Sequence, residues 1–498
     1  MQSIPPIFPA GGPLEADALR EMLRNAADRV ADYLIGLGSN PIYPANPILP
    51  AGELVPEEGE ELCDIFGDAA DWFEENSIHV GHPGYMGHMD SGVALAGIVA
   101  DFMVSAVNQN LLASELAPGA TLLEKKLVNF FAHRAGFPKN SSGIFTTGGT
   151  TANLTALLLA RDTALRESSA SGLSEMPPLC IMASQDAHYS IAKSAAVIGL
   201  GSDRVIPIPV AGPQRRMDPS ALPAHFAKAI QAGMRPIAVV ATAGTTNCGA
   251  IDPIAACAEF CEEQGLWLHV DGAYGGPLIL HDVEKKRLNG LERANSLTLD
   301  PHKWLYAPKS AGILLVREGD NLRCADYEAP YLDRFEETRT ALSLSQGRKA
   351  LDGSRRFDAF KVWMILRNLG LSGIRDLQDS RLELTRWFYK TLSQDAFFKP
   401  AHIPDLTVQT FGPRNSSLKN QVAPAHKRIE EGGNHWTSCT VLDGRPYHRA
   451  VLLNPSGNES HLMNVLKALK TEHQRLSEHG EGSRALLHSA PRTESKPR

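Results

Sequence analysis

A carboxylate and a lysine each stand where an expected buried strand ends. The apolar run 266–270 leads into Asp271, and the small residues after it leave room for a ligand. A charged Asp at the end of a buried strand is costly without a partner, which favours a functional role such as holding a protonated ring nitrogen. Lys303 follows His302 at a second strand–loop junction, where a lysine can form a Schiff base with an aldehyde. Taken alone, the lysine segment is better explained by a surface lysine.

Two further segments offer groups that suit a flat, phosphorylated ring. Gly148, Gly149 and Thr150 stand directly before an expected helix, whose free N–H groups can bind a phosphate. His188 follows another expected strand and can stack on a ring. Singly, a helix cap and a half-buried loop histidine are the better explanations. Together with the carboxylate and the lysine, these groups are what a protein must supply to pyridoxal 5′-phosphate.

The elements that position these segments alternate along the chain. Between about residues 90 and 320, short apolar runs alternate with helical stretches, which predicts a mostly parallel α/β sheet covered on both faces. Ligands of such sheets sit at the carboxyl ends of the strands, where the four segments fall. The expected strands are 179–183, 237–240 and 266–270, and the expected helices are 150–166, 190–199, 219–231 and 252–264.

The composition argues against several other classes of protein. The 498 residues are 43% hydrophobic and carry a net charge of −7, so the chain lacks the basic surface that dominates nucleic-acid or anionic-membrane binding. No apolar run approaches the ~18 residues of a membrane helix, and the N-terminus has no secretory pattern. Seven scattered cysteines, an odd number, fit reduced thiols better than a disulfide framework. We therefore expect a cytoplasmic protein with no nucleic-acid or membrane partner.

In their order along the chain, the four segments resemble the group II pyridoxal-phosphate-dependent amino-acid decarboxylases. That family includes glutamate, cysteine-sulfinate, diaminobutyrate and aromatic-amino-acid decarboxylases. The resemblance runs from about residue 82 to about residue 470. The segments that carry it, besides those of His188 and Asp271, are His82–Tyr85, Ala117–Glu124, Ala241–Asn247, Asp300–Leu305 and Ser354–Asp358.

The resemblance assigns a role to each candidate residue. Lys303 becomes the Schiff-base lysine, His188 the ring-stacking base and Asp271 the partner of the pyridinium nitrogen. The other cofactor contacts that it implies are Gly148, Gly149, Thr150 and His302 at the phosphate, Thr246 near the 3-hydroxyl and Ala273 on the ring. Tyr85, His88 and Asn108 correspond to walls of the substrate pocket. Arg449 corresponds to an arginine that holds the substrate carboxylate, and a structural salt bridge is an equally good explanation for it.

The resemblance also implies an architecture. It is the α/β fold type I of pyridoxal-phosphate enzymes, similar to aspartate aminotransferase, with a large sheet domain and a small C-terminal α/β domain. An amphipathic helix over 15–37 and a Pro/Gly-rich arm over 38–56 indicate packing against a partner. We expect residues 1–88 to form this arm, 89–375 the cofactor domain, 376–476 the small domain and 477–498 a disordered tail. The expected assembly is a homodimer with the active site at the interface.

The implied activity is that of a lyase of amino-acid metabolism. It would decarboxylate an L-amino acid, acidic or small and polar, to the amine and CO2. Many relatives use a loop tyrosine to protonate the substrate Cα, but 332–354 contains no tyrosine, and Leu344 stands at the expected place. This departure leaves three alternatives: a shifted alignment, another proton donor such as His188, or a decarboxylation-dependent oxidative deaminase that releases an aldehyde.

Two rival classes are less well supported. A non-catalytic relative would be expected to lose Lys303 or Asp271, and both are present. A metal enzyme would need a recognised ligand spacing, which neither the histidines at 79, 82 and 88 nor the cysteines at 257 and 261 have. We therefore expect no metal.

Overall fold

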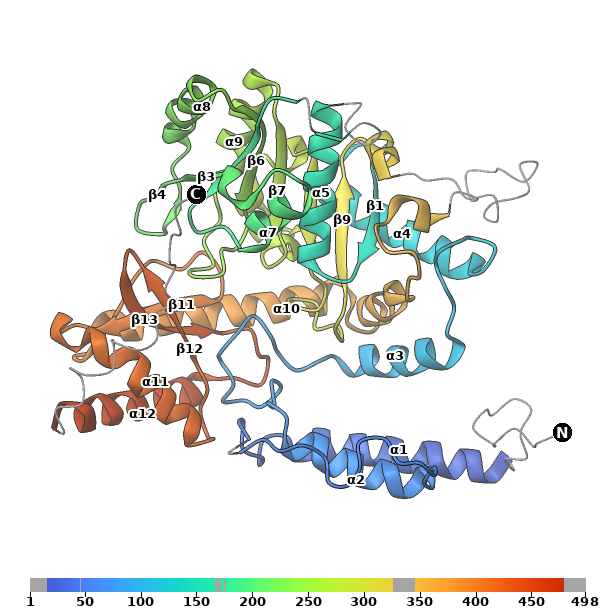
Figure 1. The fold of residues 1–498 in the computed structure, drawn as a ribbon. Coiled ribbons are helices and arrows are strands. Elements are labelled where there is room, and N and C mark those ends of the chain that lie inside the picture. The colour runs from blue at the N-terminus through green and yellow to red at the C-terminus, as the bar shows by residue number, and fades with distance from the viewer. Residues whose placement is uncertain (1–15, 45, 166–171, 174–175, 326–344, 479–498) are drawn as a thin grey trace.

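The fold is described by a computed structural model for residues 16–44, 46–165, 172–173, 176–325 and 345–478. Within these residues the largest sheet has seven strands, in the order β1-β9-β8-β7-β6-β2-β3 (Figure 1). Neighbouring strands are parallel except where β9 pairs antiparallel with β1 and β8. In chain order the strands are β1 (Ser142–Thr146), β2 (Leu179–Ser184), β3 (Val205–Ile208), β6 (Arg235–Thr242), β7 (Trp267–Gly272), β8 (Ser296–Leu299) and β9 (Gly312–Val316).

Helices cover both faces of this sheet. Because side chains alternate along a strand, Ile181 and Val240 join one buried core, whereas Met182 and Val239 join the other. This confirms the predicted mostly parallel α/β sheet and its expected strands. The helices between the strands also agree with the predicted ranges; the helices of this part are α3 (Leu95–Val107), α4 (Pro118–Arg134), α5 (Gly149–Ala164), α7 (Ser190–Val197), α8 (Leu222–Gln231) and α9 (Ile254–Gln264).

A second, smaller sheet lies in the C-terminal part. Its four strands are antiparallel in the order β10-β11-β13-β12, and a separate apolar core joins them to the helices beside them. The long helix α10 (Asp358–Gln394) connects the two parts, and its backbone leaves helical geometry at Gly370. The predicted domain boundary at 375/376 falls inside this helix. The remaining elements are β10 (Phe398–Pro400), β11 (Val408–Pro413), α11 (Val422–Glu431), β12 (Ser438–Leu442), β13 (Arg445–Val451), α12 (Glu459–Glu478) and a small hairpin of β4 (Val210–Ala211) and β5 (Arg216–Met217).

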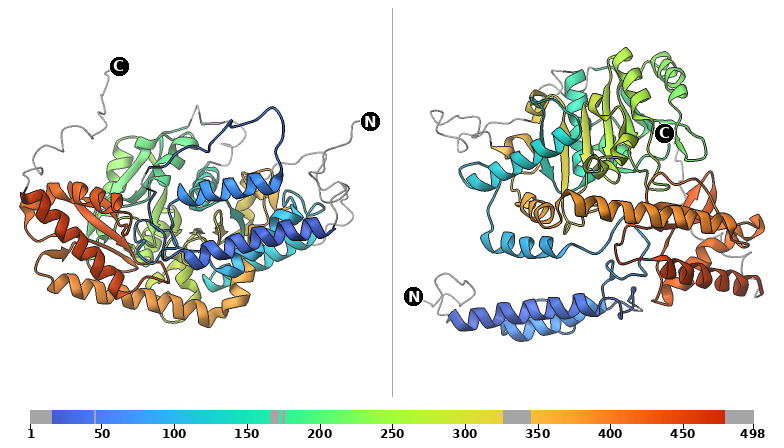
Figure 2. Two further views of the ribbon diagram at one scale, coloured as in Figure 1. Left: turned by 90° about the horizontal axis from the view of Figure 1, so that it is seen from below. Right: turned by 180° about the vertical axis from the view of Figure 1, so that it is seen from behind.

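The N-terminal helices stand apart from the body of the chain. Helix α1 (Ala16–Gly36), the predicted amphipathic helix, lies alongside α2 (Leu62–Glu75), and neither has a buried residue (Figures 1 and 2). The arm between them touches the C-terminal part, because Ile42 is fully buried and its N–H donates to the carbonyl of Gly433.

Two of the segments that carried the family resemblance meet in a buried ion pair. Arg355 places Nη2 at 2.7 Å from Oε1 of Glu124, and the two side chains are 4% and 0% exposed. The same guanidinium nitrogen donates to the carbonyl of Phe145 on β1, which leads toward the glycines at the start of α5. The ion pair therefore helps to hold β1, and with it the start of α5, in place.

We predict that Arg355→Met lowers the free energy of unfolding by about 3–5 kcal/mol, because it leaves the Glu124 carboxylate buried without its cation. Urea denaturation of the full chain measures this change. The double variant Glu124→Gln/Arg355→Met is expected to recover part of the loss, since it buries no charge. A loss below about 1 kcal/mol for the single variant would contradict this role of the pair.

Candidate active site

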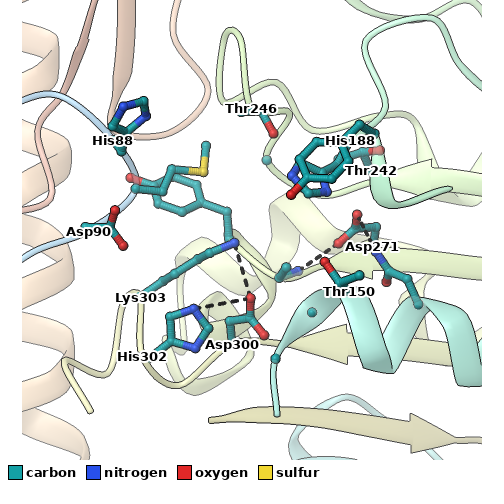
Figure 3. A pocket seen from close by; sticks show the side chains of 18 of the residues that line it. His88, Asp90, Thr150, His188, Thr242, Thr246, Asp271, Asp300, His302 and Lys303 are labelled. Atoms are coloured by element: carbon teal, nitrogen blue, oxygen red, sulfur yellow. Dashed lines mark hydrogen bonds and ion pairs between the residues drawn. The ribbon is translucent and has the colours of Figure 1, made fainter. Parts of the chain in front are cut away.

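A cavity of 530 Å³ lies at the carboxyl ends of the central strands. Figure 3 shows that side chains from several separate segments point into it. The sequence-predicted residues that line it are His88, Gly148, Gly149, Thr150, His188, Thr246, Asp271, Ala273, His302, Lys303 and Arg449. Segments as far apart in the chain as those of His88 and Arg449 thus meet in one cavity, at the sheet edge where a parallel topology places ligands.

Asp271 lies near the end of β7 and is held by two hydrogen bonds. Its Oδ2 accepts from Nδ2 of Asn153 at 2.9 Å, and its Oδ1 accepts from the N–H of Ala273 at 3.2 Å. The other end of the Asn153 amide lies 3.0 Å from Nε2 of His269. Burial lowers the pKa of His269 to about 4, so this ring stays neutral and orients the amide. The carboxylate is thereby fixed at one wall of the cavity.

Asn153 was missed by the sequence analysis. It lies on α5 four residues after Gly149, one helical turn from the predicted cradle, and it is fully enclosed. A buried amide on the same helix face as a ligand-binding turn is the signal that could have found it.

Lys303 projects its amine into the cavity from the loop after β8. Its Nζ lies 3.2 Å from Oδ2 of Asp300, a residue that the sequence analysis did not single out (Figure 3). Among the cavity-lining residues that the structure describes, Lys303 carries the only primary amine. An aldehyde in the cavity therefore has one lysine within reach.

His188 is oriented by the residue two positions after it. Its Nδ1 lies 2.9 Å from Oγ of Ser190, which also accepts from Nδ2 of Asn153. Burial lowers the pKa of His188, so the ring is uncharged at neutral pH and can lie against another ring. One hydrogen-bonded network thus positions both His188 and Asp271.

The first turn of α5 is shaped for close approach of a ligand. A Cβ on Gly149 would come within 2.8 Å of Oδ2 of Asp300 and 3.1 Å of Cβ of Ala273. Only glycine therefore leaves this turn open, with the free N–H groups of a 16-residue helix facing the cavity. Pyridoxal 5′-phosphate fits this set of groups: the phosphate cradle at the start of α5, the carboxylate of Asp271, the neutral imidazole of His188 and the amine of Lys303.

Comparison with protein families agrees with this fit. Residues 46–409 match the model of the pyridoxal-dependent decarboxylase conserved domain, which is most of the chain. The chain belongs to the pyridoxal-dependent decarboxylases. When bound, the cofactor of this family supplies a conjugated ring that accepts the electron pair released at the substrate Cα as the carboxylate leaves.

Individual relatives support the same assignment. The chain is 34% identical to L-2,4-diaminobutyrate decarboxylase of Rhizobium meliloti over 477 residues, which cover 92% of this chain and 93% of the relative. It is 32% identical to an acidic amino acid decarboxylase of Bos taurus over 375 residues, 74% of this chain and 68% of the relative. The crystal structure of mouse CSAD superposes with a TM-score of 0.85 at 27% identity, over 92% of this chain and 99% of that one. The predicted fold, cofactor and decarboxylase activity are confirmed.

Arg449 reaches the cavity of this decarboxylase from β13. It is 4% exposed, and its guanidinium donates to the carbonyl of Thr246 at 2.7 Å and to Oγ of Ser438 at 2.9 Å. Within the described part of the chain, no carboxylate lies within 4.0 Å of it, so the structural salt bridge weighed above is not formed there. Burial lowers the pKa of Arg449, and the charge of Asp90, which forms no ion pair with it, offsets only part of this effect.

The structure does not bring Tyr85 and Asn108 to the cavity lining of a single chain. Tyr85 is buried with its ring edge-on to Trp436, and its hydroxyl accepts from the N–H of His88 at 3.3 Å. Asn108 ends α3 in a left-handed conformation and is exposed. The predicted contacts of both residues with substrate stay predictions. Leu344 lies outside the described residues.

The described residues contain neither a membrane-spanning helix nor a cluster of metal ligands. No helix among them is both long and apolar enough to cross a membrane. They also contain no group of three His, Cys, Asp or Glu side chains placed to hold a metal ion.

Proposed function

We propose that this decarboxylase acts on an acidic or small polar L-amino acid and releases the amine and CO2. Arg449 carries this proposal, because a buried guanidinium without an anionic partner lies in the cavity that Lys303 enters. An isolated buried charge is costly, and a carboxylate is the ligand that pairs best with an arginine. Substrate binding would supply the missing anion.

The rest of the cavity lining includes several polar side chains beside Met89 and Tyr274. His88, Asp90 and Thr246 (Figure 3) line the same cavity as Arg449. Burial and the charge of Arg449 lower the pKa of His88, which leaves a neutral ring that can hydrogen-bond to a polar side chain. Hydrogen-bonding groups such as those of His88 and Thr246 favour a polar amino acid over an aromatic one, in line with the diaminobutyrate and acidic amino acid decarboxylases named above.

Plain decarboxylation is preferred over the aldehyde-forming alternative. That alternative depends on the tyrosine-free stretch 332–354, of which residues 332–344 lie outside the described part of the chain. The two curated relatives reported above both carry decarboxylase names.

We further propose that the enzyme works as a homodimer in the cytoplasm. Helix α3 exposes Leu95, Val99, Phe102 and Met103, and no residue of the two N-terminal helices is fully buried in its own chain. Apolar surface of this extent is typical of an interface, and Asn108, at the end of the same helix, would reach the partner's cavity. The six cysteines whose side chains are described are free thiols, which supports a reducing compartment. A solution mass of twice the chain mass is the expected result of light scattering on the holoenzyme, and a monomer would contradict it.

The variant Arg449→Gln tests the substrate assignment. It is expected to lower kcat/KM by about 10- to 100-fold, mainly through a higher KM, because a charged hydrogen bond to the substrate carboxylate is lost. The assay compares acidic, diamino and aromatic amino acids at equal concentration. Arg445→Gln is the matched control, since Arg445 lies on the same strand outside the cavity lining. An unchanged KM for Arg449→Gln, or a preference for aromatic substrates, would refute the proposal.

A further inference from the structure

We propose that Asp300 makes cofactor binding depend on proton uptake: its carboxylate lies inside the phosphate cradle, and the cluster around it gains a proton when a phosphate monoester binds. This inference concerns the cofactor and does not depend on which amino acid is the substrate. Asp300 acts here by making the binding of the anion depend on pH.

The position of Asp300 is the first observation. Its side chain is 4% exposed and packs against the opening turn of α5, where a Cβ on Gly149 would lie 2.8 Å from Oδ2. Its other oxygen, Oδ1, is buried and has no hydrogen-bond partner among the described residues. A buried acceptor without a donor is rare, and this one belongs to a residue that lines the cavity at the helix N-terminus.

The charges around Asp300 form the second observation. The nearest cation is Lys303, with Nζ at 3.2 Å, and the nearest titratable ring is that of His302, with Nε2 at 3.7 Å. Across the cavity lie Asp271, a second carboxylate, and His188, whose pKa is lowered by burial, so its ring adds no positive charge at neutral pH. Arg449 and Asp90 also line the cavity, so two cations face three carboxylates among the described lining residues before any phosphate arrives.

A phosphate monoester brings close to two further negative charges at neutral pH. In a site that is largely shielded from water, like charges at such distances repel strongly, and one relief is to bind a proton. By contrast, an uncharged amide in the place of Asp300 would meet the phosphate without this penalty.

The structure offers two places for the proton. His302 has Nδ1 at 2.6 Å from the carbonyl of Ala311, which only accepts, so Nδ1 carries the hydrogen and Nε2 is free to take another. That nitrogen faces Asp300. The second place is the unpartnered Oδ1 of Asp300 itself. At either atom the cluster binds one proton from solvent, and no other covalent bond forms or breaks.

Titration calorimetry on the full chain, freed of its cofactor, tests this. The probe is phenyl phosphate, a phosphate monoester with neither an aldehyde that could bond to Lys303 nor a ring nitrogen that could take up a proton beside Asp271. Runs at about pH 8 in buffers of different ionisation enthalpy count the protons taken up, because the buffer supplies them. We expect close to one proton per site for the wild type, and a Kd that rises about tenfold per pH unit above neutrality.

Asp300→Asn keeps the shape of the side chain and removes its charge. The variant is expected to take up clearly fewer protons per site than the wild type. It is also expected to bind the probe with a Kd at least about tenfold lower at about pH 8. Asp203→Asn, which removes an exposed carboxylate outside the cavity lining, should behave as the wild type does. Equal proton uptake in the wild type and Asp300→Asn would overturn the proposal. Absence of uptake in the wild type would overturn it as well, whether or not the variant folds.

Discussion

Replacing Lys303 with alanine is expected to lower kcat by at least about 10³-fold, because no other amine can form the covalent link to the cofactor aldehyde. Lys303 holds the only primary amine among the described residues that line the cavity. The variant should also lack the visible absorbance of a lysine-bound cofactor. Steady-state kinetics and an absorbance spectrum of the purified protein measure both effects.

Lys309→Ala is the control for this variant. Lys309 lies six residues further on, is 57% exposed and pairs with Asp90 at 2.6 Å, without lining the cavity. It should retain the lysine-bound spectrum. Activity of Lys303→Ala within about tenfold of the wild type would mean that the assigned lysine is wrong.

Replacing Asp271 with asparagine is expected to lower kcat by about 10²-fold or more while the cofactor still binds. The carboxylate is placed to keep a proton on the ring nitrogen, and this proton is what allows the ring to accept electrons. An amide of the same shape keeps the packing but cannot balance the pyridinium charge. The measurements are kcat with saturating cofactor and the stoichiometry of bound cofactor.

Asp252→Asn provides a matched control for Asp271→Asn. Asp252 is also a buried carboxylate, held by the N–H groups of Met217 and Thr242, and burial raises its pKa to about 7. It does not line the cavity. A loss of stability in both variants with a loss of kcat only in Asp271→Asn would support the catalytic role. Equal losses of kcat would show that packing alone explains the effect.

Much of the central architecture is readable from the sequence. The run 266–270 is apolar at most of its positions, as is expected of a strand that is buried on both faces. This run becomes β7, and Asp271 lies near its carboxyl end. Gly148 caps α5 and Gly149 opens it, where a Cβ on Gly149 would meet Asp300 and close the first turn. Parallel topology then brings these separate segments together, which is why candidates chosen along the chain line one cavity.

Other parts of the site depend on three-dimensional packing that spacing does not reveal. Asn153 acts through a hydrogen bond to Asp271, a residue 118 positions away, and its role follows from the side of α5 that is buried. Asp300 belongs to the same segment as Lys303. Its closeness to Gly149 depends on how the segment after β8 packs against the start of α5 in the folded chain. The boundary placed at 375/376 fell inside α10, because helical periodicity continues through both halves and only Gly370 marks the break.

Tyr85 and Asn108 were predicted to line the substrate pocket, but they do not line the cavity of a single chain. Their neighbours in sequence, His88 and the residues of α3, lie at the cavity mouth and on an exposed apolar face respectively. Tyr85 is buried against Trp436 of its own chain, whereas the predicted contact of Asn108 with substrate depends on the proposed partner subunit.

The most direct test of the central claim is a mass balance on the purified holoenzyme. CO2, amine, aldehyde and peroxide are measured together on its best amino-acid substrate, with Lys303→Ala as the blank. We predict equal amounts of CO2 and amine, no peroxide, and no product from the blank. Aldehyde with peroxide in place of the amine, or product formation by Lys303→Ala, would contradict the account.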